Sequence, residues 1–172
     1  CIFVDDASYS TTNWTDVDAT TTFVNNEAEC EALNTNLFQP RTKVELEAAV
    51  NGWTASPQTI TADSPVPSGQ GSGTYGAMNT WDVSLITDMS FLFAGKTTFN
   101  DDILNWNTSS VTDMNSMFFD ASSFNQDISS WCVTNITSEP ASFSTDSGLE
   151  ENNKPNWGTC VAFIYLDDNG IT

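Results

Sequence analysis

The stretch Trp106-Asn-Thr-Ser-Ser-Val-Thr-Asp-Met-Asn-Ser-Met-Phe118 decides the fold, because its residues recur along the chain at a fixed distance. Trp81, Trp106 and Trp131 stand 25 residues apart. The same step relates Ile86, Val111 and Ile136; Thr87, Thr112 and Thr137; Met89 and Met114; Phe93, Phe118 and Phe143; Phe99-Asn100 and Phe124-Asn125; and Ile103 and Ile128. A period of this length is typical of stacked repeats, whose units bury a shared core against their neighbours.

Each unit contains the pattern of one strand and one short helix. Residues 86–89 and 111–114 are short, alternating and β-branched, which suits a strand of a parallel ladder. Residues 114–118 place apolar side chains at i, i+3 and i+4, which is typical of one or two helical turns. The sequence therefore predicts an α/β repeat, a short leucine-rich-repeat-type solenoid with parallel strands and short helices. The three Trp residues are expected in its core, and Asn100 is expected to stack above Asn125 and satisfy buried backbone groups at the turn.

The ends of the repeat region differ from its middle, as the ends of a stack must. Thr42-Lys-Val-Glu45 is a capping box, and apolar residues at helical spacing follow it, so we expect an N-terminal cap helix. In the last unit Pro140 falls where Asn115 stands in the unit before. We expect a capped repeat domain over residues 40–160, with repeats near 81–105, 106–130 and 131–160. A flanking segment with a β-strand, residues 1–39, precedes it, and a C-terminal β-strand segment, residues 161–172, follows.

The charge and composition exclude several classes of function. Four Lys and Arg face 23 Asp and Glu, and the formal net charge of -19 repels phosphate backbones, so nucleic acid is not an expected partner. The chain has no His, which removes the commonest general base and transition-metal ligand. Asp pairs such as Asp101-Asp102 are interpreted as solvated turn carboxylates, with calcium binding and the acid and base work of a carboxylate hydrolase as the alternatives. We predict no catalytic residue, no cofactor and no metal site, and the lack of a long apolar run predicts no membrane insertion.

Four widely spaced cysteines, Cys1, Cys30, Cys132 and Cys160, indicate two disulfides and an oxidising compartment. Three connectivities are possible. We favour Cys1 with Cys30 and Cys132 with Cys160, because closing a short loop costs less entropy. Sequons place candidate glycosylation sites at Asn13, Asn107 and Asn135.

The repeats resemble those of the BspA-like leucine-rich-repeat surface proteins, whose units begin Trp-Asp-Val-Ser-x-Val-Thr-Asp-Met and end Phe-Asn-x-Asp-Ile. The match is seen over residues 81–89, 106–114 and 124–131. The resemblance implies a secreted or cell-surface protein engaged in adhesion or matrix contact, without enzymatic activity. Only two full repeats and a degenerate third are present here, so the wide concave face of longer members is missing.

The two chain ends share an apolar outline that suggests strand pairing. Candidate assembly-strand residues are Val161, Phe163, Tyr165, Ile2 and Val4. Such strands can pair within the chain, with an adjoining domain, or with a second copy to form a homo-oligomer or fibre. The sequence thus predicts a non-catalytic extracellular structural or adhesive module, whose partners are other surface or matrix proteins or glycans. The alternative is a carbohydrate- or protein-binding, lectin-like surface module.

Overall fold

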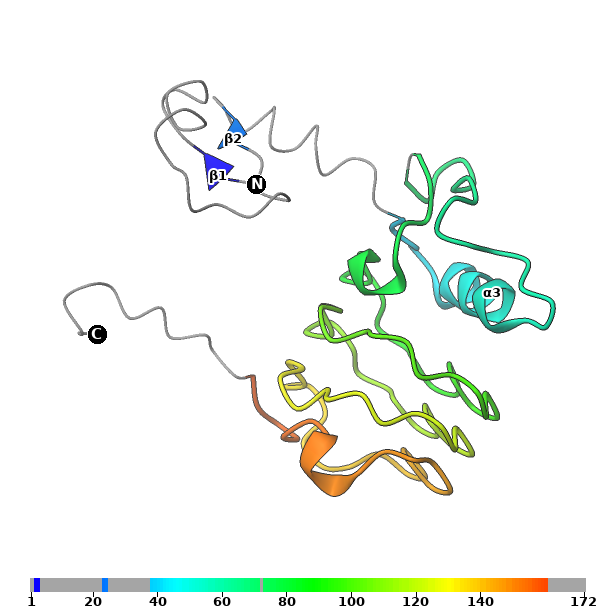
Figure 1. Ribbon diagram of the computed structural model, residues 1–172. Coiled ribbons are helices and arrows are strands. Elements are labelled where there is room, and N and C mark those ends of the chain that lie inside the picture. The colour runs from blue at the N-terminus through cyan, green and yellow to red at the C-terminus, as the bar shows by residue number, and fades with distance from the viewer. Residues whose placement is uncertain (1, 4–22, 25–37, 72, 161–172) are drawn as a thin grey trace, which may run out of the picture.

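The computed structural model describes residues 2–3, 23–24, 38–71 and 73–160. Strand β1 (Ile2–Phe3) pairs in parallel with β2 (Phe23–Val24), so that Ile2 stands opposite Phe23. Helix α3 spans Lys43–Thr54, and two single-turn 3-10 helices follow, η1 at Met78–Thr80 and η2 at Glu151–Asn153. From Met78 onward the chain winds into coils that lie one on another (Figure 1).

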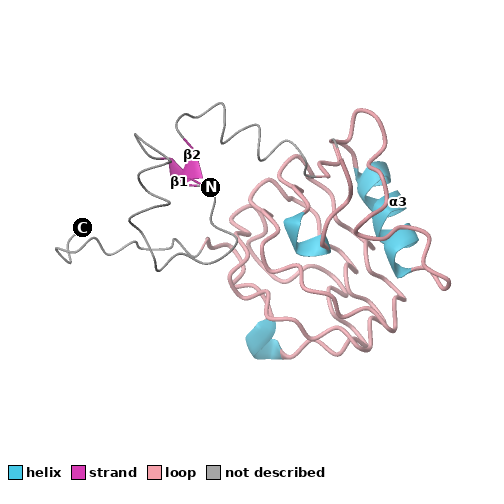
Figure 2. Cartoon of the chain, turned by 45° about the horizontal axis from the view of Figure 1, so that its top comes forward, coloured by secondary structure: helices cyan, strands magenta, loops and turns pink. Residues whose placement is uncertain are grey.

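The predicted α/β solenoid with parallel strands and short helices is wrong. Across residues 38–71 and 73–160 there is no β-strand, and α3 is the only α-helix, so the coils consist of turns and irregular chain (Figure 2). One isolated parallel bridge, between Asp88 and Asp113, stands where the strand ladder was expected. The predicted strand over residues 161–172 lies outside the described residues.

A turn ladder replaces both the strand and the helix. The backbone N–H groups of Phe91 and Phe93 donate to the carbonyl oxygens of Asn115 and Met117 in the next coil, at 3.0 and 2.9 Å. The N–H of Leu92, between them, donates to Met89 three residues back within its own coil. A strand directs alternate N–H groups to opposite neighbours and a helix directs all of them along its own axis, so this alternation fits neither element.

Left-handed backbone conformations make the alternation possible. Phe91, Ser116 and Ser142 have φ values of 61°, 55° and 53° and occupy equivalent places in successive coils. A positive φ reverses the direction of the peptide group within a turn. Residues other than Gly adopt positive φ values uncommonly, so the tertiary structure must favour them here. The i, i+3, i+4 spacing of residues 114–118 therefore reflects which side chains turn inward and does not indicate a helix.

Aromatic columns fill the interior of the stack, and the prediction that the Trp residues belong to the core is confirmed. Trp81, Trp106 and Trp131 are 2–3 % exposed. The rings of Trp81 and Trp106 stack with centroids 6.3 Å apart, and those of Phe93 and Phe118 stack at 5.4 Å with an interplanar angle of 1°. Offset stacking adds to the stability gained from burying these large apolar surfaces.

The third coil departs from the 25-residue step by one residue. The N–H of Phe143 donates to the carbonyl oxygen of Pro140, as that of Met117 donates to Met114. Phe143 therefore takes the place of Met117, and its ring stands perpendicular to that of Phe118 (89°) instead of continuing the stack. Pro140 takes the place of Met114, so the assignment of Pro140 to the place of Asn115 was wrong.

Helix α3 covers the first coil. Its predicted capping box is present: the Thr42 hydroxyl accepts from the Glu45 N–H, and the Glu45 carboxylate accepts from the Thr42 N–H. The helix buries Leu46, Ala49 and Val50, and Trp53 meets Trp81 edge to face with ring centroids 5.5 Å apart. Capping satisfies N–H groups that have no partner in the first turn, which fixes where the helix begins.

Candidate functional site

Acidic and amide side chains lie in columns along the polar edges of the coils. At each site a side-chain oxygen accepts the backbone N–H two residues ahead, which closes a turn. In the first column Asp82 accepts from Ser84 and Asn107 from Ser109. In the second, Asp88 accepts from Ser90 and Asp113 from Asn115. In the third, Asp102 accepts from Leu104 and Asp127 from Ser129. The carboxylates in these columns build turns, as expected of Asp102, whereas its neighbour Asp101 accepts from the Trp53 indole.

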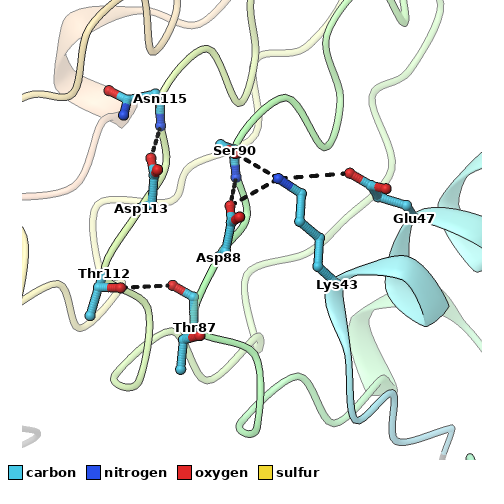
Figure 3. Close-up of polar contacts among 8 residues, drawn as sticks. All are labelled: Lys43, Glu47, Thr87, Asp88, Ser90, Thr112, Asp113 and Asn115. Carbon is cyan, nitrogen blue, oxygen red and sulfur yellow. Dashed lines mark hydrogen bonds and ion pairs between the residues drawn. The ribbon is translucent and has the colours of Figure 1, made fainter.

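One of these columns is joined to the cap helix by a charged contact (Figure 3). The Nζ of Lys43 donates to Asp88 Oδ1 at 2.9 Å and to the Ser90 hydroxyl at 2.6 Å, and it lies 3.8 Å from Glu47. In the next coil Asp113 accepts from the Asn115 N–H but no described Lys or Arg forms an ion pair with it. The contact fixes one end of α3 to the first coil. Lys96 fixes the other end, because its Nζ donates to Asn51.

The pKa values of three column carboxylates are lowered. Burial alone would raise the pKa of Asp88, but hydrogen bonds from Lys43 and Ser90 and the positive charge of Lys43 outweigh it. Burial would likewise raise the pKa of Asp82, which hydrogen bonds from Ser84 and Gln39 bring below its usual value. The pKa of Asp127 falls because the side chain and backbone of Ser129 both donate to it. Each carboxylate is held in the charged form, which suits a structural acceptor and not a general acid.

An asparagine ladder runs along another edge, as predicted from the recurrence of Asn100 and Asn125. The Asn100 side-chain oxygen accepts from the Asn125 N–H at 3.0 Å, and the Asn125 oxygen accepts from the Glu150 N–H at 2.9 Å. Asn153 adds a side-chain bond to Asn125 at 2.9 Å. The ladder is exposed, so it links coils at their surface and does not satisfy buried groups.

A disulfide closes the C-terminal end of the stack. Cys132 is bonded to Cys160, which confirms that predicted pairing, while Cys1 and Cys30 lie outside the described residues. The closing segment also pairs with the last coil, because the Gly158 N–H donates to Ile136 at 2.8 Å and the Val133 N–H donates to Thr159 at 2.8 Å.

A hollow of about 580 Å³ opens beside the disulfide, between the second and third coils. Its polar lining includes Asn105, Asn107, Asp127 and Ser130, and Leu104 forms an apolar part of the wall. Trp106 and Trp131 border it, but both are nearly fully buried in the core, so their ring faces are not offered for stacking on a ligand.

The predicted glycosylation sites differ in their surroundings. Asn107 and Asn135 are both exposed. The side-chain nitrogen of Asn135 donates to the Ser109 carbonyl oxygen at 2.8 Å, whereas the Asn107 side chain accepts from Ser109 through its oxygen. Asn13 lies outside the described residues.

Comparison with known families adds one result. The family model described as "Mycoplasma protein of unknown function, DUF285" matches residues 69–162, more than half of the 172 residues. The chain belongs to the DUF285 family. The search of curated proteins and the search of solved structures found no match.

The DUF285 match contains the coils, the hollow and the disulfide, whereas α3 and its contact residue Lys43 lie before it. Sequence reasoning missed the contact between Lys43 and Asp88, which lie 45 residues apart. The one available signal was the scarcity of basic residues, since only four exist to balance 23 acidic ones.

Of the predicted assembly-strand residues, the structure describes Ile2, which pairs within the chain with Phe23. The other four, Val4, Val161, Phe163 and Tyr165, lie outside the described residues. Among the described residues, no group of three or more Cys, Asp and Glu side chains is arranged to hold a metal ion. No helix in the described part of this DUF285 chain is long and apolar enough to cross a membrane.

Proposed function

We propose that this DUF285 chain is a non-catalytic module of an extracellular or cell-surface protein that presents its coil surfaces to other surface or matrix proteins or glycans. The observation that carries the proposal is the use of the recurring carboxylates as turn acceptors. Because Asp82, Asp88 and Asp127 are hydrogen-bonded and held in the charged form, they serve the stack and not a reaction.

Three further features support a surface location. Two successive repeats, residues 81–103 and 106–128, carry the start and end motifs of BspA-like surface proteins in register. The disulfide between Cys132 and Cys160 is the kind of bond that persists in oxidising compartments. An acidic, strongly charged surface also favours solubility of an exposed module.

Antibody labelling tests the location. An antibody raised against the folded chain should label intact cells of the native organism without permeabilisation, and a cytoplasmic marker should stay unlabelled under the same conditions. Labelling that requires permeabilisation would contradict the proposal. Binding is tested separately by passing the purified chain over immobilised matrix proteins, with a heat-unfolded, reduced sample as the control.

The hollow beside the disulfide favours glycan binding as the second candidate function. Asn105, Asp127 and Ser130 offer amide, carboxylate and hydroxyl groups that can bond sugar hydroxyls. A glycan array should then give selective signals that fall in an Asn105→Ala and Ser130→Ala double variant and persist in Ser123→Ala, an exposed position outside the hollow. Equal signals for all three chains would argue against the hollow as the site.

Fibre formation by strand pairing through Val161, Phe163 and Tyr165 remains a proposal. Electron microscopy of the concentrated chain should reveal regular filaments if these strands pair between copies, because head-to-tail contacts do not close. Monodisperse single particles at the same concentration would contradict it.

A further inference from the structure

The coil at the C-terminal end of the stack has an unpaired hydrogen-bonding edge, which we call the Ser142 edge and define as residues 142–146. In the second coil the N–H groups of Ser116, Phe118 and Asp120 donate to Ala141, Phe143 and Thr145 in the third. The equivalent donors of the third coil are Ser142, Ser144 and Asp146. Among the described residues, none of these three N–H groups has a hydrogen-bond partner.

The backbone of this edge keeps the geometry of a paired coil. Ser142 and Asp146 have φ values of 53° and 57°, matching 55° and 56° at Ser116 and Asp120. The turn bonds from Phe143 to Pro140 and from Ser147 to Ser144 are also present. The donors are therefore already oriented, and a partner would not have to order them on binding, which lowers the entropic cost of association.

A hollow lies at the same place. It measures about 430 Å³ and is lined by Glu139, Pro140, Ser142, Phe143, Ser144, Thr145 and Lys154. It provides room for a side chain beside the row of donors, the combination by which strand-adding sites take up peptides.

The opposite end of the stack has no such edge. The N–H groups of the first coil already donate to the second coil. Helix α3 is held against the first coil by Lys43, which donates to Asp88, and by Lys96, which donates to Asn51 of the helix. Ser90 and Leu92 of the first coil are buried, so a second copy offers the Ser142 edge few exposed carbonyls there. Its own Ser142 edge would bring donors against donors, so this edge does not favour self-association.

The charge around the Ser142 edge selects among other partners. Lys154 is the one basic residue lining the hollow, and its Nζ lies 2.9 Å from Glu139 and 2.8 Å from Glu151. Asp146 and Glu150 are exposed nearby in the sequence, and the whole chain carries a formal net charge of -19. An acidic peptide would be repelled, and a basic one attracted.

We propose that the Ser142 edge binds an extended, basic peptide segment of a partner protein. Within the stack the equivalent donors are met by carbonyls at every second residue of the neighbouring coil, at Ala141, Phe143 and Thr145. An extended peptide also presents its carbonyls along one edge at every second residue. Lys or Arg side chains of the peptide face the surrounding carboxylates, and the hollow beside Pro140 leaves room for one further side chain. The inference rests on the proposed binding role and names the class of partner.

Amide hydrogen exchange measured by NMR tests the edge in the free protein. The amides of Ser142, Ser144 and Asp146 should exchange much faster than those of Ser116, Phe118 and Asp120, which serve as the internal control. Slow exchange at all three would overturn the proposal. If deletion of residues 161–172 then speeds the exchange of these amides, the chain's own C-terminal segment is the occupant. If dilution of the protein speeds it, a second copy is the occupant.

A peptide titration tests the partner. An acetylated and amidated peptide of five Lys-Val repeats should shift and protect the same three amides, and a peptide of five Glu-Val repeats should not. Asp146→Asn, which keeps a residue tolerant of positive φ, should weaken binding of the Lys-Val peptide by about threefold at low salt. Asp63→Asn, the same charge change on an exposed residue remote in sequence, should leave binding unchanged.

Equal binding of both peptides, or shifts confined to other residues, would overturn the proposal. The cell labelling and the glycan or matrix assays do not depend on this edge, so failure of the peptide titration is distinguishable from failure of the proposed function.

Discussion

The indole nitrogen of Trp106 donates a hydrogen bond to the carbonyl oxygen of Met78, 2.8 Å away in the preceding coil. Trp131 repeats the contact one unit later, with the carbonyl of Ile103 at 3.3 Å. Trp81 begins the column, and its indole nitrogen is buried without a partner among the described residues. Each internal Trp thus ties its coil to the one before, while the first Trp meets aromatic rings of the cap region.

Replacing these Trp residues by Phe should separate the hydrogen bond from the packing. Trp106→Phe should lower the free energy of unfolding by about 2–4 kcal/mol, since it loses volume and leaves the Met78 carbonyl with the Trp81 N–H as its remaining donor. Trp81→Phe should cost about 1 kcal/mol less, because it removes an N–H that has no partner. Urea unfolding followed by circular dichroism measures both. Equal losses would show that the indole bond contributes nothing.

Gly148 should not tolerate a side chain. A Cβ at this position would lie 2.6 Å from the carbonyl oxygen of Ser122, which belongs to the backbone of the coil before and cannot move away alone. Gly148→Ala should therefore lower the unfolding free energy by about 1–3 kcal/mol. Ser123→Ala, at an exposed position nearby, is the control and should leave the urea midpoint unchanged. A wild-type midpoint for Gly148→Ala would mean that the third coil is free to shift.

The contact between Lys43 and Asp88 should make stability depend on acid. The pKa of Asp88 is lower in the folded chain than the usual value of about 3.9 expected when unfolded, so its contribution is present above about pH 4 and is lost as the pH falls further. Asp88→Asn should flatten the fall in the urea midpoint below about pH 4. Part of the fall remains, because Asp82 and Asp127 have lowered pKa values too. Parallel curves for the two proteins below pH 4 would contradict the assignment.

The disulfide should stabilise the end of the stack. Replacing Cys132 and Cys160 together by Ala should lower the unfolding free energy by about 3 kcal/mol, since the bond closes a separation of 28 residues and restricts the unfolded chain. Alkylation of the folded protein without reductant, followed by mass analysis, should leave both cysteines unlabelled. Labelling at either position would contradict both the bond and the oxidising compartment.

The sequence by itself determined which side chains form the interior and where the cap helix begins. Apolar residues repeated every 25 positions must be buried together in successive units, so the Trp column and the stack of Phe93 on Phe118 could be predicted from spacing alone. The capping box of Thr42 and Glu45 is equally local, because both of its hydrogen bonds join residues three apart. The bond between Cys132 and Cys160 was one of three possibilities and was favoured by loop entropy.

Only the tertiary structure decided the path of the backbone between those side chains. Inward-facing residues at i, i+3 and i+4 suit a helix as well as a ladder of turns, and the choice depends on carbonyl groups of the next coil that accept the N–H groups of Phe91 and Phe93. The one-residue slip at Phe143 and the contact of Lys43 with Asp88 depend on the same placement of distant segments. The recurrence of apolar residues decides which side chains are buried. The direction of each backbone N–H group depends on the carbonyl groups of the neighbouring coil.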